Sequence, residues 1–187
     1  MRIVLDDVHL HAGTFSLAAG TIFEEGVHMI SGRVGSGKST LGSALAGLSR
    51  VGSGKIVLEE CSSPVLLMQF PEYQVTGSTI SREISSWGVS RGDPIFSRFD
   101  VEMPDRDPFT LSRGELKRLM LACVFAKDPD VLVLDEPYAS LDPSAKEVLT
   151  CSIESRRGIT IVFSHETEYA PNHAERWKIH AGGLHRE

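Results

Sequence analysis

The eight residues 32–39 constrain the fold more than any other part of this sequence. They read Gly-Arg-Val-Gly-Ser-Gly-Lys-Ser, which fits the pattern GxxxxGK[ST]. The apolar run over residues 27–31 predicts a strand before the loop, and leucines and alanines spaced by three and four predict a helix over residues 38–48 after it. A strand, a glycine-rich turn and a helix in this order form the context in which the pattern cradles phosphates. The segment therefore predicts an α/β P-loop NTPase.

The rest of the chain alternates short apolar runs with helical patterns. The run over residues 131–134 is apolar throughout, and that over residues 159–163 is apolar except for Thr160, which is typical of strands buried on both faces of a parallel sheet. We expect a mostly parallel sheet with helices on both faces and a small antiparallel β part. The predicted strands cover residues 3–5 and 8–10 (with Gly13 and Gly20 marking turns nearby), 27–31, 55–58, 65–68, 131–134, 159–163 and 176–179, and the predicted helices cover residues 38–48, 79–87, 113–127 and 144–153.

The region over residues 71–110 has a different texture. It holds four of the nine prolines, namely Pro71, Pro94, Pro104 and Pro108. Because the α/β pattern resumes afterwards, we interpret it as part of a helical lobe inserted into one domain. The predicted division is a core lobe of about residues 1–70 and 122–187 and an inserted lobe of about residues 71–121, in a single domain over residues 1–187.

Composition excludes several other classes. The formal net charge of −6 disfavours a sequence-independent grip on nucleic acid, so we expect no nucleic-acid partner. The three cysteines are far apart and indicate neither a zinc site nor a disulfide framework. The first residues do not resemble a secretory signal, and the longest apolar run, over residues 119–126, is far shorter than the ~20 residues of a membrane helix. We expect a cytoplasmic protein.

The glycine-rich loop has a direct physical role. Glycines let the backbone curl so that consecutive N–H groups point at phosphate oxygens, and the helix N-terminus adds partial positive charge. Lys38 is expected to reach the β- and γ-phosphates, Ser39 to hold Mg²⁺, and Thr40 to contact the α-phosphate side. The predicted nucleotide-binding residues are Gly32, Gly35, Ser36, Gly37, Lys38, Ser39 and Thr40.

An acidic pair ends the apolar strand over residues 131–134. Asp135 and Glu136 would therefore lie at the carboxyl edge of the sheet, where open α/β sheets bind ligands. A carboxylate at this place is a ligand that Mg²⁺ prefers, and we assign that task to Asp135. Glu136 is the predicted general base that polarises the attacking water.

Four further segments resemble those of the ABC ATPase family. Residues 111–115, Leu-Ser-Arg-Gly-Glu, resemble the signature LSGGQ, and residues 140–142, Ser-Leu-Asp, resemble the D-loop. Gln69 follows a predicted strand as in the family's Q-loop, and His165 follows another at the place of its switch histidine. With the phosphate loop and the acidic pair, six motifs occur in the family's order between residues 32 and 165, so the resemblance covers nearly the whole chain.

The resemblance implies a mechanism in which two such domains pair head to tail and sandwich two ATP molecules. The signature residues of one chain, Ser112, Arg113, Gly114 and Glu115, would face the ATP of the other. His165 would contact the γ-phosphate and the attacking water, Gln69 the metal and the water, and Asp142 would couple the two sites. The implied cofactors are ATP and Mg²⁺, the implied metal-binding residues are Ser39, Gln69 and Asp135, and the implied catalytic residues are Glu136, His165 and Gln69.

Two positions depart from the family's pattern. Many members stack adenine on an aromatic side chain ahead of the phosphate loop, and here the sequence offers His11 and Phe15 without deciding between them. Arg113 occupies the third signature position, where glycine is usual, so its side chain could contact nucleotide, partner or solvent.

Residues 69–74, Gln-Phe-Pro-Glu-Tyr-Gln, resemble the same stretch in ATPases of energy-coupling-factor importers, which take up vitamins and transition-metal ions. In that family the stretch docks a membrane subunit, so Phe70, Glu72 and Tyr73 are candidate contacts. The resemblance implies an ATPase on the inner face of the membrane, paired with a second ABC ATPase subunit as a homo- or heterodimer. The alternatives are a non-transport ABC ATPase acting on a soluble partner and a module that switches by nucleotide binding alone; the sequence does not identify a substrate.

Overall fold

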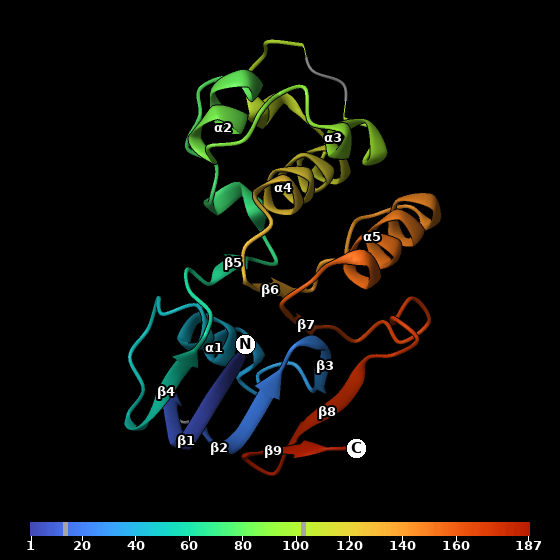
Figure 1. Cartoon of the computed structure of the whole chain (residues 1–187). Coiled ribbons are helices and arrows are strands. Elements are labelled where there is room, and N and C mark those ends of the chain that lie inside the picture. Colours follow the sequence, from blue (N-terminus) through green and yellow to red (C-terminus); the bar gives the residue numbers. More distant parts are fainter. Residues whose placement is uncertain (13–14, 102–103) are drawn as a thin grey trace.

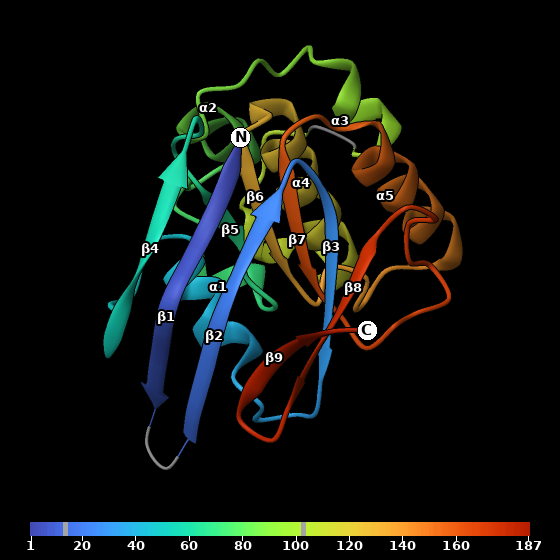
Figure 2. The same cartoon turned by 60° about the horizontal axis from the view of Figure 1, so that its bottom comes forward.

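The computed structural model describes residues 1–12, 15–101 and 104–187, so the predicted turn at Gly13 lies outside the described residues. Within this part of the chain, nine strands form one sheet in the order β4-β1-β2-β9-β8-β3-β7-β6-β5 (Figures 1 and 2). The strands are β1 Arg2–Ala12, β2 Phe15–Glu24, β3 Gly26–Gly32, β4 Ser53–Glu59, β5 Val65–Leu67, β6 Val131–Asp135, β7 Ile159–Phe163, β8 Glu175–His180 and β9 Gly183–Arg186. The helices are α1 Lys38–Leu45, α2 Ile80–Ser86, α3 Pro94–Arg98, α4 Arg113–Lys127 and α5 Pro143–Ser155, with short 3₁₀ turns η1 Pro71–Tyr73 and η2 Pro108–Thr110.

The sheet has a parallel and an antiparallel part. Strands β5, β6, β7, β3 and β8 run parallel to one another, whereas β9 pairs antiparallel with β8, and β1 pairs antiparallel with both β2 and β4. Since β3, β6 and β7 are parallel, their carboxyl ends meet at one edge of the sheet. The phosphate loop leaves β3 at this edge, and the acidic pair stands at the end of β6. The predicted fold class is confirmed.

The central strands separate two apolar clusters. Val131 and Val133 of β6 pack into one cluster with α1, β1 and β2, while Leu132 and Leu134 pack into the other with α4 and α5. This follows from the two-residue period of a strand, which sends alternate side chains to opposite faces. All five residues of β6 and of β7 are buried, as the apolar runs predicted.

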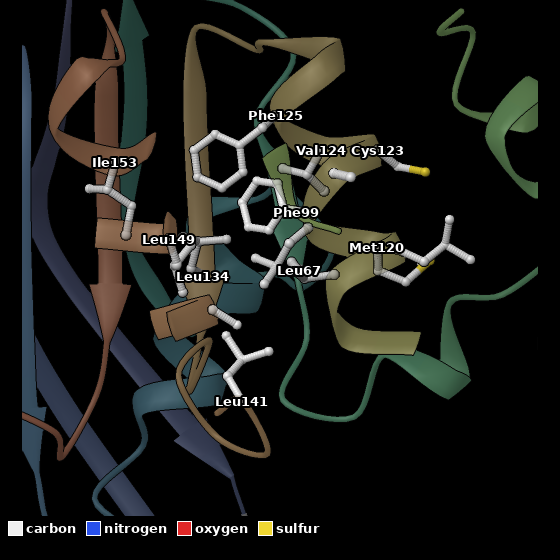
Figure 3. Close-up of a cluster of buried hydrophobic side chains, with 14 of the residues drawn as sticks. Leu67, Phe99, Met120, Cys123, Val124, Phe125, Leu134, Leu141, Leu149 and Ile153 are labelled. Atoms are coloured by element: carbon white, nitrogen blue, oxygen red, sulfur yellow. The ribbon is translucent and has the colours of Figure 1, made fainter. Parts of the chain in front are cut away.

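Helix α4 is the main buried helix on its side of the sheet. Met120, Val124 and Phe125 lie in a cluster with Phe99 and Leu149 from other elements (Figure 3). Fully burying one such side chain stabilises the fold by roughly 1.5–3 kcal/mol. In Figure 1, α2 and α3 gather around α4 at one end of the molecule, away from β1, β2 and β4. This arrangement suits the proposed inserted lobe, but its boundaries stay a prediction, since α4 crosses residue 121 without interruption.

The structure corrects several predicted elements. The two expected strands over residues 3–5 and 8–10 are one strand, β1, whose pairing shifts register between Leu5 and Val8. Asp7 has a φ of 47° at this shift in register, so it lies in a bulge within one strand and not in a turn between two strands. Helix α1 ends at Leu45 and not at residue 48, because Gly47 turns left-handed with a φ of 70°.

Three elements were absent from the prediction. Strand β2 contains Gly20, which the sequence indicated as a turn residue, and β9 follows β8 after a tight turn. Helix α3 lies in the stretch that was expected to be irregular, and Asp93 and Pro94 begin it: the Asp93 side chain accepts a hydrogen bond from the Ile95 N–H at 2.9 Å. Helix α3 and strand β9 are short, and half of the β2 residues are exposed, so their apolar patterns are weak.

None of the helices in the described residues is long and apolar enough to cross a membrane.

Candidate nucleotide site

The phosphate loop joins the end of β3 to the start of α1. Gly37 is the N-cap of α1 and has a φ of 92°, which a residue with a side chain adopts only at a cost. A Cβ on Gly37 would also overlap the ring of Phe15, which packs over the loop. The glycine is therefore required twice, by backbone conformation and by the aromatic ring above it.

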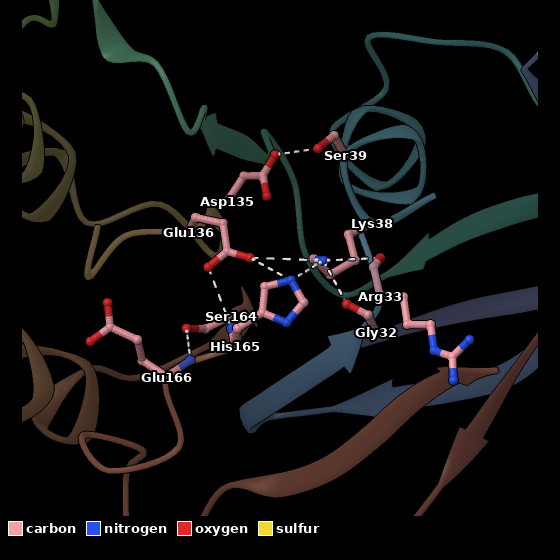
Figure 4. Close-up of polar contacts among 9 residues, drawn as sticks. All are labelled: Gly32, Arg33, Lys38, Ser39, Asp135, Glu136, Ser164, His165 and Glu166. Carbon is pink, nitrogen blue, oxygen red and sulfur yellow. Dashed lines mark hydrogen bonds and ion pairs between the residues drawn. The ribbon is translucent and has the colours of Figure 1, made fainter. Parts of the chain in front are cut away.

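Lys38 lies at the centre of a group of polar contacts (Figure 4). Its ammonium donates to the Gly32 carbonyl at 2.8 Å and lies 2.7 Å from Nε2 of His165 and 3.8 Å from a Glu136 carboxylate oxygen. Only 8% of Lys38 is exposed, so its charge acts in a partly desolvated place where electrostatic attraction is stronger than in water. The same ammonium thus connects the end of β3 with Glu136, which follows β6, and with His165 in the segment after β7.

Asp135 and Glu136 stand where the sequence predicted, and they face different partners. The Ser39 hydroxyl donates to Asp135 at 2.6 Å, which joins the start of α1 to the end of β6. The Glu136 carboxylate faces His165, with its Oε1 at 3.4 Å from Nε2 of the ring. Glu136 has a φ of 45°, and its N–H donates to the Phe163 carbonyl at 2.8 Å. A non-glycine residue in this conformation costs about 1–3 kcal/mol, and such strain is concentrated at functional sites.

These groups surround a pocket of about 550 Å³ at the carboxyl edge of the sheet. Gln69 reaches it from the segment after β5, and Phe15 borders it, whereas His11 lies beside Gly52 and is not among the lining residues. Gly32 and Ser36 line an adjoining hollow with Phe15 and Lys178. The pocket is lined by Phe15, Arg33, Val34, Gly35, Gly37, Lys38, Ser39, Thr40, Gln69, Asp135, Glu136, Ala139 and His165.

The signature segment does not line this pocket. Ser112 and Glu115 instead form a capping box at the start of α4: the Ser112 hydroxyl accepts from the Glu115 N–H at 3.3 Å, and the Glu115 carboxylate accepts from the Ser112 N–H at 2.8 Å. Hydrogen bonding of the Glu115 carboxylate to the Ser112 hydroxyl and to the Ser112 N–H holds the pKa of Glu115 below its ordinary value. The pattern S-x-x-E was visible in the sequence, so this structural role of Glu115 could have been predicted.

The signature and D-loop segments contact each other. A Cβ on Gly114 would lie 3.0 Å from the Ser140 carbonyl, so the two backbones approach closely. Arg118 of α4 pairs with Asp142 at 3.4 Å, and Asp142 also caps α5 by accepting from the Ala145 N–H at 2.9 Å. Arg113 is exposed beside this contact. The predicted site residues therefore form two groups, one around the pocket and one at the start of α4.

A buried charged residue near the pocket was missed by the sequence analysis. Lys117 of α4 is only 2% exposed and donates to the Gln69 carbonyl at 3.1 Å. Burial lowers the pKa of its ammonium to about 8. The signal was its position one turn before Met120 and Leu121 on the buried side of α4, where a lysine is unexpected.

The donor set at the end of β6 suits a hard cation. Ser39 and Asp135 offer oxygen atoms close together, and Gln69 offers an amide oxygen at the same pocket. Oxygen ligands of this kind fit Mg²⁺, which usually takes few protein ligands and shares the rest with phosphates and water. Among the described residues there is no group of three or more His, Cys, Asp or Glu side chains suited to a metal.

A strand, a phosphate loop, a helix and an acidic strand end around one pocket define a P-loop NTPase. A comparison with protein families goes further and matches residues 17–139 to the ABC transporter family. The chain belongs to this family and is an ABC ATPase.

Curated relatives agree with this assignment. The chain is 35% identical to the energy-coupling factor transporter ATP-binding protein EcfA2 of Bacillus subtilis, over 83% of this chain and 68% of the relative. It is 33% identical to the EcfA2 proteins of Caldanaerobacter subterraneus and of Bacillus licheniformis, over 74% and 82% of this chain. It spans 59% and 64% of the lengths of those two relatives. The expected resemblance to energy-coupling-factor ATPases is confirmed.

Solved structures of other cassettes share the fold. A protein described as a cobalt transport ATP-binding protein superposes with a TM-score of 0.77 at 22% identity, over 97% of this chain and 78% of the other. A dimeric ATP-binding cassette in a post-hydrolysis state, bound to ADP and phosphate, superposes with a TM-score of 0.77 at 16% identity, over 99% of this chain and 97% of the other. At these identities the likeness concerns the fold alone.

Proposed function

We propose that this chain is the ATP-hydrolysing subunit of an ABC importer of the energy-coupling-factor type, carrying a vitamin or a transition-metal ion. The observation that carries the proposal is the convergence of Lys38, Glu136 and His165 on one pocket beside the Ser39–Asp135 pair. These are the groups that ATP hydrolysis requires, and the relatives named above are transporter ATP-binding proteins.

Each group has a task in the proposed reaction. The backbone N–H groups of the phosphate loop and the Lys38 ammonium hold the phosphates and offset their negative charge. Glu136 accepts a proton from the attacking water, and His165, within reach of both Glu136 and Lys38, orients that water and the terminal phosphate. Ser39, Asp135 and Gln69 would hold Mg²⁺, which neutralises charge on the phosphate oxygens when bound. Phe15 is the better candidate to stack on adenine, because it borders the pocket and His11 does not.

The pocket supplies only half of the proposed site. Ser112, Arg113 and Gly114 lie outside it, so we propose that they act on the ATP of a second ABC ATPase subunit across a head-to-tail dimer. Ser112 offers a hydroxyl, and the start of α4 directs its positive end outward. Asp142, beside the signature segment, would couple the two sites.

The membrane partner is proposed from the segment after Gln69. Phe70 and Tyr73 are 49% and 81% exposed, and their rings meet edge to face with centroids 6.3 Å apart. Exposed aromatic pairs of this kind are typical of protein contact sites. We propose that they dock a transmembrane subunit and place the chain on the inner face of the cell membrane.

Light scattering of the Glu136→Gln variant tests the dimer proposal. The variant should bind ATP without hydrolysing it, so MgATP should convert it from monomer to dimer. A monomer in both conditions, with ATP binding confirmed, would show that the chain does not pair with itself. Purification of the wild-type chain with its bound partners tests the alternative. A membrane protein that co-purifies would favour a transporter, and a soluble partner would favour a non-transport ABC ATPase.

A further inference from the structure

The segment that carries Gln69 is held by a buried lysine that no motif assigns. Lys117 lies on α4, two residues after the signature segment, and is only 2% exposed. Its ammonium donates to two consecutive backbone carbonyls, those of Gln69 at 3.1 Å and Met68 at 3.4 Å. Among the residues that the structure describes, no carboxylate pairs with it directly; Asp135, Glu72 and Glu136 attract it from further away.

A buried ammonium without a direct counter-ion is costly. The neighbours of Lys117 along the buried side of the same helix are apolar, since Met120, Leu121 and Val124 are fully buried. A leucine or methionine at this position would avoid the desolvation cost, so the retained charge indicates a task besides packing. The contacts identify that task as fixing the backbone that leads from β5 into the pocket.

The neighbouring contacts show how completely this backbone is fixed. The Gln74 side chain accepts from the Met68 N–H at 2.8 Å and donates to the Leu66 carbonyl at 2.8 Å. Met68 is therefore held on its N–H by Gln74 and on its carbonyl by Lys117. Gln69 is held through its carbonyl by Lys117, and within the described part of the chain no other side chain is seen to bond to the Gln69 backbone. The Lys117 ammonium is thus the side-chain contact at the point where the chain enters the pocket.

A second buried charge holds the far end of the same segment. Glu83 of α2 is fully buried and accepts from the N–H groups of Thr76 at 2.8 Å and Gly77 at 2.6 Å. The two ends of the segment are therefore held by different side chains: Lys117 binds carbonyl oxygens at the Gln69 end, and Glu83 binds N–H groups at the Thr76 end. Loss of Lys117 should therefore loosen the Gln69 end and leave the Thr76 end in place.

We propose that Lys117 is a positioning residue, which sets the Gln69 side chain in the nucleotide pocket by holding the Gln69 carbonyl. The inference rests on the proposed function, in which Gln69 acts on the metal and the attacking water. It also links the signature helix to the pocket of its own chain, since Lys117 and Ser112 belong to one helical segment.

A double-mutant cycle with Gln69 tests the proposal. Lys117→Met should lower kcat for ATP about tenfold with little change in KM, because small misplacements of catalytic groups are costly. In a Gln69→Ala background the same change should lower kcat less than twofold, since the group that Lys117 positions is already gone. Equal losses in both backgrounds would overturn the proposal. Lys127→Met is the matched control, because Lys127 also donates from α4 to a carbonyl, that of Trp87 at 3.3 Å, and should change kcat less than twofold.

Hydrogen exchange gives a reading that does not depend on turnover. In Lys117→Met the amides of residues 68–74 should exchange faster, while those of Thr76 and Gly77, which Glu83 holds, should keep their wild-type rates. Unchanged exchange over residues 68–74 would overturn the role of Lys117. A wild-type chain that fails to hydrolyse ATP even when it is paired with its partner ATPase subunit would instead count against the proposed function, and the exchange experiment would still decide on Lys117.

Discussion

The phosphate loop and the signature segment are both glycine-containing turns that begin a helix, yet they are built differently. Gly37 opens α1 without a side-chain cap, and the surrounding groups reach into a shared pocket. Ser112 opens α4 with a complete capping box, and its segment contacts the D-loop outside the pocket. The first turn leaves its N–H groups to a ligand, whereas the second satisfies part of its own. The difference suggests one half-site that holds nucleotide and another that is presented to a partner.

The largest effect is expected at the pocket half. Glu136→Gln should lower kcat at least a hundredfold while leaving ATP affinity within about twofold, because it removes a proton acceptor and not a phosphate contact. Steady-state hydrolysis and equilibrium nucleotide binding measure the two quantities. Glu147→Gln, an exposed change on α5, is the control and should alter neither. Substantial ATPase activity in Glu136→Gln would show that another residue acts as the general base.

Lys38→Ala should act on binding. Charge-assisted hydrogen bonds contribute about 1.5–3 kcal/mol, so ATP affinity should fall roughly tenfold to a hundredfold. Lys55→Ala removes an exposed lysine of β4 and serves as the control. If ATP titrations gave the same dissociation constant for Lys38→Ala and wild type, the pocket would not be the phosphate site.

The signature half should show the opposite pattern. Ser112→Ala should lower kcat about tenfold and leave ATP binding by the monomer within twofold, because in the proposed dimer the hydroxyl acts on the nucleotide of the partner. The change also removes a helix N-cap, which costs about 1 kcal/mol. Thr79→Ala removes the cap of α2 in the same way, since Thr79 accepts from the Arg82 N–H, so it is the matched control. An equal fall in kcat in both variants would reduce the role of Ser112 to helix capping.

The smallest expected effect is on the pH dependence of stability, where His28 in the sheet and Glu115 at the signature segment should act in different pH ranges. His28 on β3 is buried, donates to the Glu24 carbonyl and accepts from the Trp177 indole, and burial lowers its pKa. The unfolded chain then binds the extra proton first as pH falls, so stability should decrease below about pH 6.5. The pKa of Glu115 is also lowered, but its contribution is present above the ordinary pKa of a glutamate, about 4.3, and is lost only below it.

Thermal unfolding between pH 7.5 and 5.5 tests this separation. Within that window the wild type should lose stability through His28 and not through the Glu115 cap. His28→Gln should flatten the pH dependence, and His173→Gln, an exposed change, should leave it as in wild type. The same slope in all three proteins would contradict the assignment to His28.

The sequence predicted the pocket half well, because its chemistry is local. The motif of residues 32–39 and the pair Asp135–Glu136 can each be recognised from a few adjacent positions, and strands β6 and β7 are buried at every residue and mostly apolar. The strands with weak apolar patterns were not predicted: β2 carries a glycine in its interior, and β9 is short and largely exposed. Their pairing is decided by neighbours far away in the sequence, such as the single parallel pair between Ala18 and Gly183.

The contacts between motifs could not be predicted. The sequence placed Lys38 and His165 in one site but not at hydrogen-bond distance, and it did not choose Phe15 over His11. It also did not indicate that Lys117 bridges the signature helix and Gln69, which are 48 positions apart. Each of these facts depends on packing between segments that are distant in the chain.

The central claim is that this chain holds only half of a working nucleotide site. Specific ATPase activity, measured over a dilution series alongside the molar mass from light scattering, tests it most directly. The account predicts that the monomer binds ATP without turning it over, so specific activity should fall on dilution in step with the fraction of dimer, or be absent without the partner subunit. Undiminished activity at dilutions where the protein is monomeric would contradict it.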